Sequence, residues 1–237
     1  MGVGSLDQKM ELEKGTISIP VDIAYGSLSL FTSIVHNVFL LYHVDMFVSV
    51  YKIDQTSFWI GEMIFLVWNS LNDPMFGWIS DKSSLSSGNK QLGSSDIIQK
   101  RIDALKWTGP LFAISFLAFW IQWANPGLQF VICLCVYDGF LTMIDLHHSA
   151  LLADIAISAE GRTKLNSRAS FFSIIGSASV FISYAVWNKD NLRMFREFCL
   201  VLTVISLIGF FLMTRVLKKI FQEHSETRPP KEDAKSR

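Results

Sequence analysis

Long runs of apolar residues, separated by short polar segments, dominate the chain. Each run approaches the roughly 20 residues that an α-helix needs to cross the hydrocarbon core of a bilayer. The segments between the runs carry most of the charged residues. The pattern predicts an all-α, polytopic membrane protein built as a bundle of six transmembrane helices. The predicted spans are residues 21–44, 58–79, 104–123, 128–153, 168–187 and 198–216.

Polar segments flank the predicted membrane domain, residues 21–217. Residues 1–20 mix Asp, Lys and Glu with few apolar residues, which is not the pattern of a cleaved signal peptide, and we predict a cytosolic tail. Residues 218–237 combine many charges with a Pro pair, so we predict a disordered cytosolic tail. The longest internal loop, 81–101, is rich in Ser and Gly and is predicted to be flexible.

The basic residues fall unevenly on the two sides of the predicted bundle. With the N-terminus inside, 17 of the 21 Lys and Arg lie on the inner side. The positive-inside rule therefore places both termini in the cytosol, and we expect residence in the plasma membrane.

Composition agrees with a membrane protein and excludes some other classes. Half of the 237 residues are hydrophobic and 18% are charged, with Lys and Arg balancing Asp and Glu at 21 each. A net charge of zero offers no broad basic surface, so nucleic acid is not an expected partner. The three cysteines lie inside apolar runs, which argues against a disulfide framework.

The second span carries polar residues at membrane depth. Glu62, Asn69 and Asp73 are spaced by seven and four residues, so a helix presents them on one face. Pro74 and Gly77 follow and interrupt regular packing. An intramembrane carboxylate is costly and normally faces a partner or a cavity.

A second polar stripe runs along one face of the fourth span. Asp138, Thr142, Asp145 and Ser149 share one helical face, and His147-His148 lies just beside it. These groups either hydrogen-bond among themselves and to other helices, or they line a polar cavity that serves a solute or proton pathway.

The first span carries a similar seam of small and polar residues. Ser29, Ser33, His36 and His43 lie near one face of the predicted helix. Helix packing and cavity lining both account for such a seam.

Enzyme signatures are incomplete. Tyr137-Asp138 matches the first half of an intramembrane aspartyl protease pair, but no Gly-x-Gly-Asp follows in another span. A histidine-box metal site needs several His clusters, whereas three of the five histidines are scattered. No Gly-rich phosphate loop or Ser-His-Asp set is present. We therefore expect neither an enzyme, nor a cofactor, nor a resident metal.

Two sequence segments carry a family resemblance. Asn72-Asp73-Pro74-x-x-Gly77-Trp78, followed by Asp81-Lys82, resembles the second-helix signature of the glycoside–pentoside–hexuronide:cation symporters of the major facilitator superfamily. Met143-Ile144-Asp145 is similar to their fourth-helix motif. The resemblance implies a major facilitator fold, of which six helices form one half of a twelve-helix transporter. On this resemblance the chain is expected to be a truncated half.

The resemblance also implies roles for particular residues. Asp73 corresponds to a cation-coupling acid, while Asn69 stands where the family has a second acid. Asp145 corresponds to the acid that binds sugar hydroxyls. The family's stacking aromatic is replaced by Ser149, and Ser170 stands at the position of its sugar-site Arg.

Together these observations predict a multi-pass membrane protein similar to a cation-coupled, sugar-type solute symporter. The expected partners are the lipid bilayer, a small polar solute, a coupling Na⁺ or H⁺, and a second copy or second six-helix half. The alternative is a non-transporting membrane protein that acts by pairing, for example with a full-length form. The predicted substrate-binding residues are Asp145, Asp138, Ser149 and His36, and the predicted cation-coupling residues are Asp73, Asn69 and Glu62.

Overall fold

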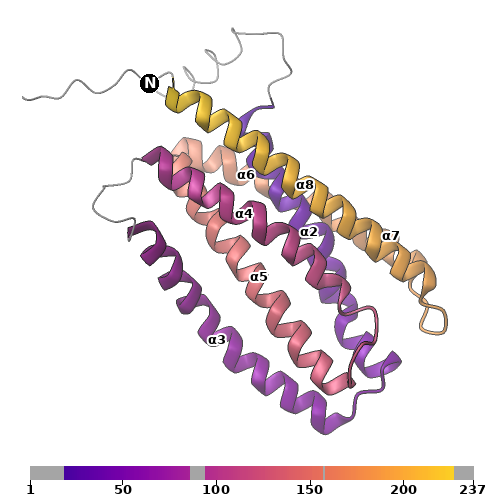
Figure 1. Cartoon of the computed structure of the whole chain (residues 1–237). Helices are drawn as coiled ribbons and strands as arrows, with labels where there is room; N and C mark the ends of the chain where they lie inside the picture. The colour runs from indigo at the N-terminus through magenta and orange to yellow at the C-terminus, as the bar shows by residue number, and fades with distance from the viewer. Residues whose placement is uncertain (1–18, 86–93, 157, 227–237) are drawn as a thin grey trace, which may run out of the picture.

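The computed structural model describes residues 19–85, 94–156 and 158–226. In these ranges the chain is built from helices, without strands. Figure 1 shows long helices packed side by side, with α3 at one edge of the bundle and α8 at the other. The helices are α2 (Val21–Asp45), the π-helical η1 (Met46–Val50), α3 (Gln55–Leu85), α4 (Ser94–Leu117), α5 (Pro126–Ile155), α6 (Ala159–Ser177), α7 (Ser179–Val186) and α8 (Arg193–Glu226).

The predicted all-helical membrane architecture is confirmed. Four helical segments of the described chain are long and apolar enough to cross a membrane: Val21–Val50, Pro126–Ile155, Ala159–Val186 and Arg193–Glu223. The helices α3 and α4, of 31 and 24 residues, are long enough but carry more polar residues. The count of six crossing helices therefore stays a prediction.

Several helices extend beyond the predicted spans. The helix α3 continues to Leu85 and α4 begins at Ser94, so most of the predicted loop 81–101 is helical. The predicted disorder from residue 218 onward is wrong for residues 218–226, which belong to α8. There Leu217 is fully buried and Phe221 packs against the core, so the apolar stripe of α8 continues past the predicted span. The predicted tails at 1–18 and 227–237, and residues 86–93, lie outside the described residues.

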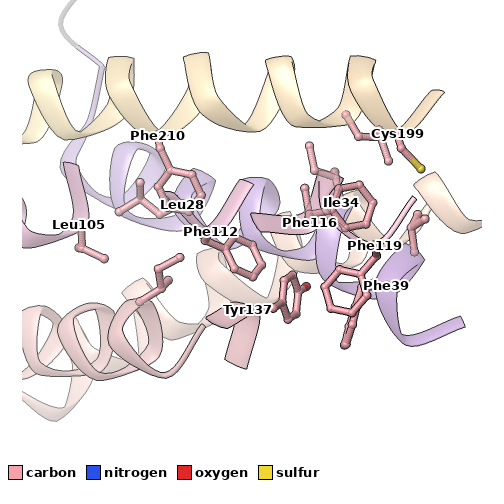
Figure 2. Packing of buried hydrophobic residues seen from close by; sticks show 14 of the residues in the cluster. Leu28, Ile34, Phe39, Leu105, Phe112, Phe116, Phe119, Tyr137, Cys199 and Phe210 are labelled. Atoms are coloured by element: carbon pink, nitrogen blue, oxygen red, sulfur yellow. The ribbon is translucent and has the colours of Figure 1, made fainter. Parts of the chain in front are cut away.

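The core is aromatic and lies where α4 meets α2, α5 and α8. Figure 2 shows Phe112, Phe116 and Phe119 beside Phe39 and Tyr137, all of them buried. The rings of Phe39 and Tyr137 lie 4.1 Å apart, and that of Phe119 meets Phe39 edge-on at 5.0 Å. Such geometries add to the burial energy of large rings. This core fixes α5, which carries the polar stripe, against the rest of the bundle.

Small residues let α2 and α6 approach closely. A Cβ atom added at Gly176 would lie 2.8 Å from the backbone oxygen of Leu30 and from Cβ of Ser33. Ser33 and Ser173 share a hydrogen bond of 2.7 Å, and Asn37 donates one of 3.0 Å to Ser177. Part of the polar seam predicted on the first span thus serves helix packing.

Candidate functional site

A polar cavity of about 550 Å³ lies between α2, α5 and α6. Hydroxyl groups from all three helices line it, together with two imidazoles and one carboxylate. The lining contains no Lys or Arg. The polar lining residues are Tyr25, Ser29, Thr32, Ser33, His36, Asp145, His148, Ser149, Asn166, Ser170 and Ser173.

Asp145 is the charged carboxylate of this cavity. It lies two-thirds of the way along α5, is exposed, and makes no hydrogen bond to the described part of the chain. Ser149, one turn further on, is exposed to the same cavity. An ionised carboxylate is an acceptor for several hydrogen bonds. Asp145 and Ser149 can therefore both bind the hydroxyl or ammonium groups of a solute.

Two histidines at the cavity are held by tyrosines. Nδ1 of His36 lies 3.2 Å from the hydroxyl of Tyr137, which is buried in the aromatic core. The ring of His148 stacks on Tyr25 with centroids 4.1 Å apart, and its Nε2 lies 3.2 Å from the Tyr25 backbone oxygen. His36 joins the cavity to the core, and His148 ties α5 to α2.

A second polar group joins α3 to α5. Asn72 is fully buried and its amide donates a short hydrogen bond to Asp138. The hydroxyl of Thr142 lies 3.2 Å from a carboxylate oxygen of Asp73 and 3.4 Å from the Asn72 side-chain oxygen. Gly61 on α3 leaves room for the close approach, since an atom of the Phe130 ring on α5 lies 2.7 Å from where its Cβ would be. Asn72, Asp73, Asp138 and Thr142 are called the α3–α5 cluster below.

The structure brings together some of the predicted site residues and separates others. Asp145, Ser149 and His36 line the cavity, whereas Asp138 lies in the α3–α5 cluster with Asp73. Glu62 and Asn69 make no hydrogen bond within the described residues, and Asn69 is exposed. The predicted cation-coupling set is therefore represented in the cluster by Asp73 alone.

The carboxylates of the cavity and of the α3–α5 cluster are close enough to interact electrostatically. Asp73 interacts electrostatically with both Asp138 and Asp145. Three carboxylates from two helices thus share one region of the bundle. A cation or proton held near Asp73 would change the field at Asp145, because carboxylates interact strongly where water is scarce.

Several residues at these sites were not singled out from the sequence as site residues. Tyr25, Asn166 and Ser173 line the cavity, and Asn72 holds Asp138. The sequence signal at Asn72 was its position in the family signature next to Asp73. Ser173 both hydrogen-bonds to Ser33 and faces the cavity.

The described chain is a bundle of long apolar helices with a polar cavity between three of them, which is the architecture of a multi-pass membrane protein. The chain belongs to the MFS/sugar transport protein family, whose sequence profile matches residues 19–236. The family is described by transport rather than by catalysis.

Two relatives are similar over most of the chain. "Transmembrane protein 180" of Gallus gallus is 60% identical over 212 residues, which are 89% of this chain and 42% of the relative. "Transmembrane protein 180" of Mus musculus is 58% identical over 206 residues, 86% of this chain and 40% of the relative. The chain thus spans about two fifths of the length of these relatives. No solved structure matches the chain.

Proposed function

We propose that this chain forms part of a solute pathway, with Asp145 as the main solute contact. The main support is that Asp145 is exposed in a cavity of about 550 Å³, without a hydrogen-bond partner in the described chain. A carboxylate at membrane depth is retained where it contacts a substrate or an ion. The hydroxyl-rich lining and the lack of Lys and Arg favour a neutral polyol, sugar-type or cationic amine solute over an anion.

Coupling to Na⁺ or H⁺ belongs to the same proposal, at the α3–α5 cluster. Asp73 is exposed, accepts from Thr142 and interacts with Asp145. Binding of a cation at Asp73 reduces the repulsion between the two carboxylates and so changes the affinity of Asp145 for a solute. Asp138 accepts a hydrogen bond from Asn72 and so positions that side chain beside Thr142 in this scheme.

A second candidate function is pairing with another membrane domain. Asp145, Ser149 and Ser170 are exposed on one side of the described bundle. Such groups do not face lipid hydrocarbon, because the bilayer core offers them no hydrogen bonds. A second copy of the chain, or a six-helix body in a full-length form, would cover them. In the plasma membrane, pairing without transport is the alternative role.

Asp145→Asn tests the solute role. We measure binding and uptake in proteoliposomes for a panel of sugars, polyols and amines, for the chain alone and co-reconstituted with a full-length relative. A charge-assisted hydrogen bond is worth about 1.5–3 kcal/mol, so Asp145→Asn should weaken solute binding by about tenfold or more. Its thermal stability should stay close to that of the parent, because Asp145 holds no other described group.

Asp190→Asn is the matched control, since Asp190 is an exposed acid in the connection between α7 and α8. It should bind solute like the parent. Equal binding by the parent and Asp145→Asn would contradict the proposed contact. If neither preparation binds any solute of the panel while the chain co-purifies with the full-length relative, the pairing role is the supported one.

A further inference from the structure

A second, smaller cavity of about 160 Å³ lies between α3, α4 and α5, apart from the solute cavity. It is formed by the end part of α3, the second and third turns of α4 and the last third of α5. Its character is mixed, with polar donors on one side and apolar side chains on the other. The lining residues are Phe76, Ile79, Ser80, Lys100, Arg101, Ala104, Met143, Leu146 and His147.

Cationic and neutral hydrogen-bond donors converge in this cavity. Lys100 and Arg101 bring two positive charges to the lining. Arg101 engages Asp154 through Nε, which leaves four guanidinium N–H groups for another acceptor. Nδ1 of His147 is buried and has no hydrogen-bond partner in the described residues. A buried polar atom of this kind is normally satisfied by a ligand or water.

The cavity lies near the ends of its helices on one membrane surface. Residues 72 and 138, and residues 73 and 142, pair between α3 and α5, so these two helices run parallel and end on the same side. Trp78 precedes the lining residue Ile79, Trp107 follows Ala104 by about one turn, and the two are 62% and 68% exposed. Lys82 lies 4.7 Å from the Trp78 ring. Exposed Trp with Lys is typical of the membrane–water interface, so the cavity lies at the depth of lipid headgroups.

We propose that this cavity binds the phosphoryl group of an anionic phospholipid. Lys100, Arg101 and His147 bind the phosphate oxygens, and Ser80 adds a hydroxyl at the rim. Phe76, Ile79 and Leu146 contact the first methylenes of the acyl chains. The basic-residue distribution assigns this surface to the cytosol, whose leaflet is rich in anionic lipid. The inference is independent of the solute role, since the solute cavity carries Asp145 and the opposite charge.

The test is lipid binding by the detergent-purified chain, measured by native mass spectrometry over a lipid titration. The probes are dioctanoyl phosphatidylinositol phosphate, dioctanoyl phosphatidylcholine and inorganic phosphate. We expect the anionic lipid to bind and the other two to bind at least tenfold more weakly. Removal of one cation near a membrane surface weakens anionic lipid binding by about fivefold, so Lys100→Gln should raise the apparent Kd by about that factor. Lys100→Gln with His147→Leu should raise it further.

Lys106→Gln is the matched control, because Lys106 is on the same helix and does not line the cavity. It should bind the anionic lipid like the parent. Arg101 is left unchanged, because its removal would strip Asp154 of its partner. Thermal melting identifies any variant that fails to fold. If the double variant Lys100→Gln with His147→Leu does not fold, His147→Gln is measured in its place.

Three results would overturn the proposal. The first is equal binding of the anionic lipid and phosphatidylcholine. The second is inorganic phosphate binding as tightly as the lipid, which would make this a site for a free anion. The third is an equal loss of binding in Lys100→Gln and Lys106→Gln.

Discussion

At the scale of single residues, two asparagines of α3 that are three positions apart differ in burial. Asn72 is fully buried against α5, while Asn69 is exposed. The seven-and-four spacing of Glu62, Asn69 and Asp73 correctly placed them near one helical face. It did not show which face meets α5, because that depends on the partner helix rather than on α3 alone. The residue that holds Asp138 was therefore missed.

The difference in burial between Asn72 and Asn69 allows a direct test of the α3–α5 cluster. Asn72→Ala removes the donor to the half-buried carboxylate of Asp138, which then has no described partner, whereas Thr142 keeps its hydrogen bond to Asp73. We expect a loss of about 1–3 kcal/mol in stability. Asn69→Ala, the same change on the exposed side, should stay within about 0.5 kcal/mol of the parent. Thermal melting in detergent compares the two. Equal effects of both substitutions would contradict the structural role of Asn72.

At the scale of elements, apolar length predicted α2, α5, α6 with α7, and α8 well. Their lipid-facing and core-facing surfaces are both apolar, so the pattern is continuous. Their ends were predicted less well. Helices continue beyond the predicted spans where an apolar stripe still packs on a neighbour, as Leu217 and Phe221 do on α8. Hydropathy reports where the membrane ends, and backbone hydrogen bonding does not end there.

The packing of α2 on α6 makes a second stability prediction. Gly176→Ala places a methyl group 2.8 Å from a backbone oxygen that cannot move without shifting α2. We expect Gly176→Ala to lower stability by about 1–3 kcal/mol. Gly77→Ala is the control, because no atom lies within 4 Å of its added Cβ. It should be neutral or stabilise α3 by up to about 1 kcal/mol, the helix-propensity gain of Ala over Gly.

Thermal melting, with detergent and protein concentration held constant, compares the stability of Gly176→Ala with that of Gly77→Ala. A Gly176→Ala variant as stable as Gly77→Ala would show that α2 and α6 do not approach as closely as the structure has them.

At the scale of the whole molecule, the candidate site depends on three helices brought together from distant parts of the chain. The sequence identified Asp145, Ser149 and His36 as candidates from α5 and α2, but it did not show that α6 lines the same cavity. Helical periodicity gives the face of each helix and not its neighbours. The family resemblance predicted a major facilitator fold, and the family match over residues 19–236 agrees with that fold.

The number of membrane crossings depends on whether α3 and α4 cross in addition to the four candidate spans. If both cross, Lys82 at the end of α3 lies on the cytosolic side. If neither crosses, Lys82 stays on the outer side with the residues that follow α2. Asn191 and Glu160 bracket α6 and α7, so they lie on opposite sides in either case.

Single cysteines at these three positions distinguish the two topologies. The native Cys133, Cys135 and Cys199 are replaced by Ala in this background. An impermeant thiol reagent applied to intact cells should label Asn191→Cys only, and permeabilised cells should add Lys82→Cys and Glu160→Cys. This result is expected because the 17 inner basic residues include Lys82, and moving such charges across the bilayer is opposed. Labelling of Lys82→Cys in intact cells would leave four crossings. In that case α3 could not run beside α5, which is itself one of the four candidate spans, and the α3–α5 cluster with its proposed coupling of Asp73 to Asp145 would be lost.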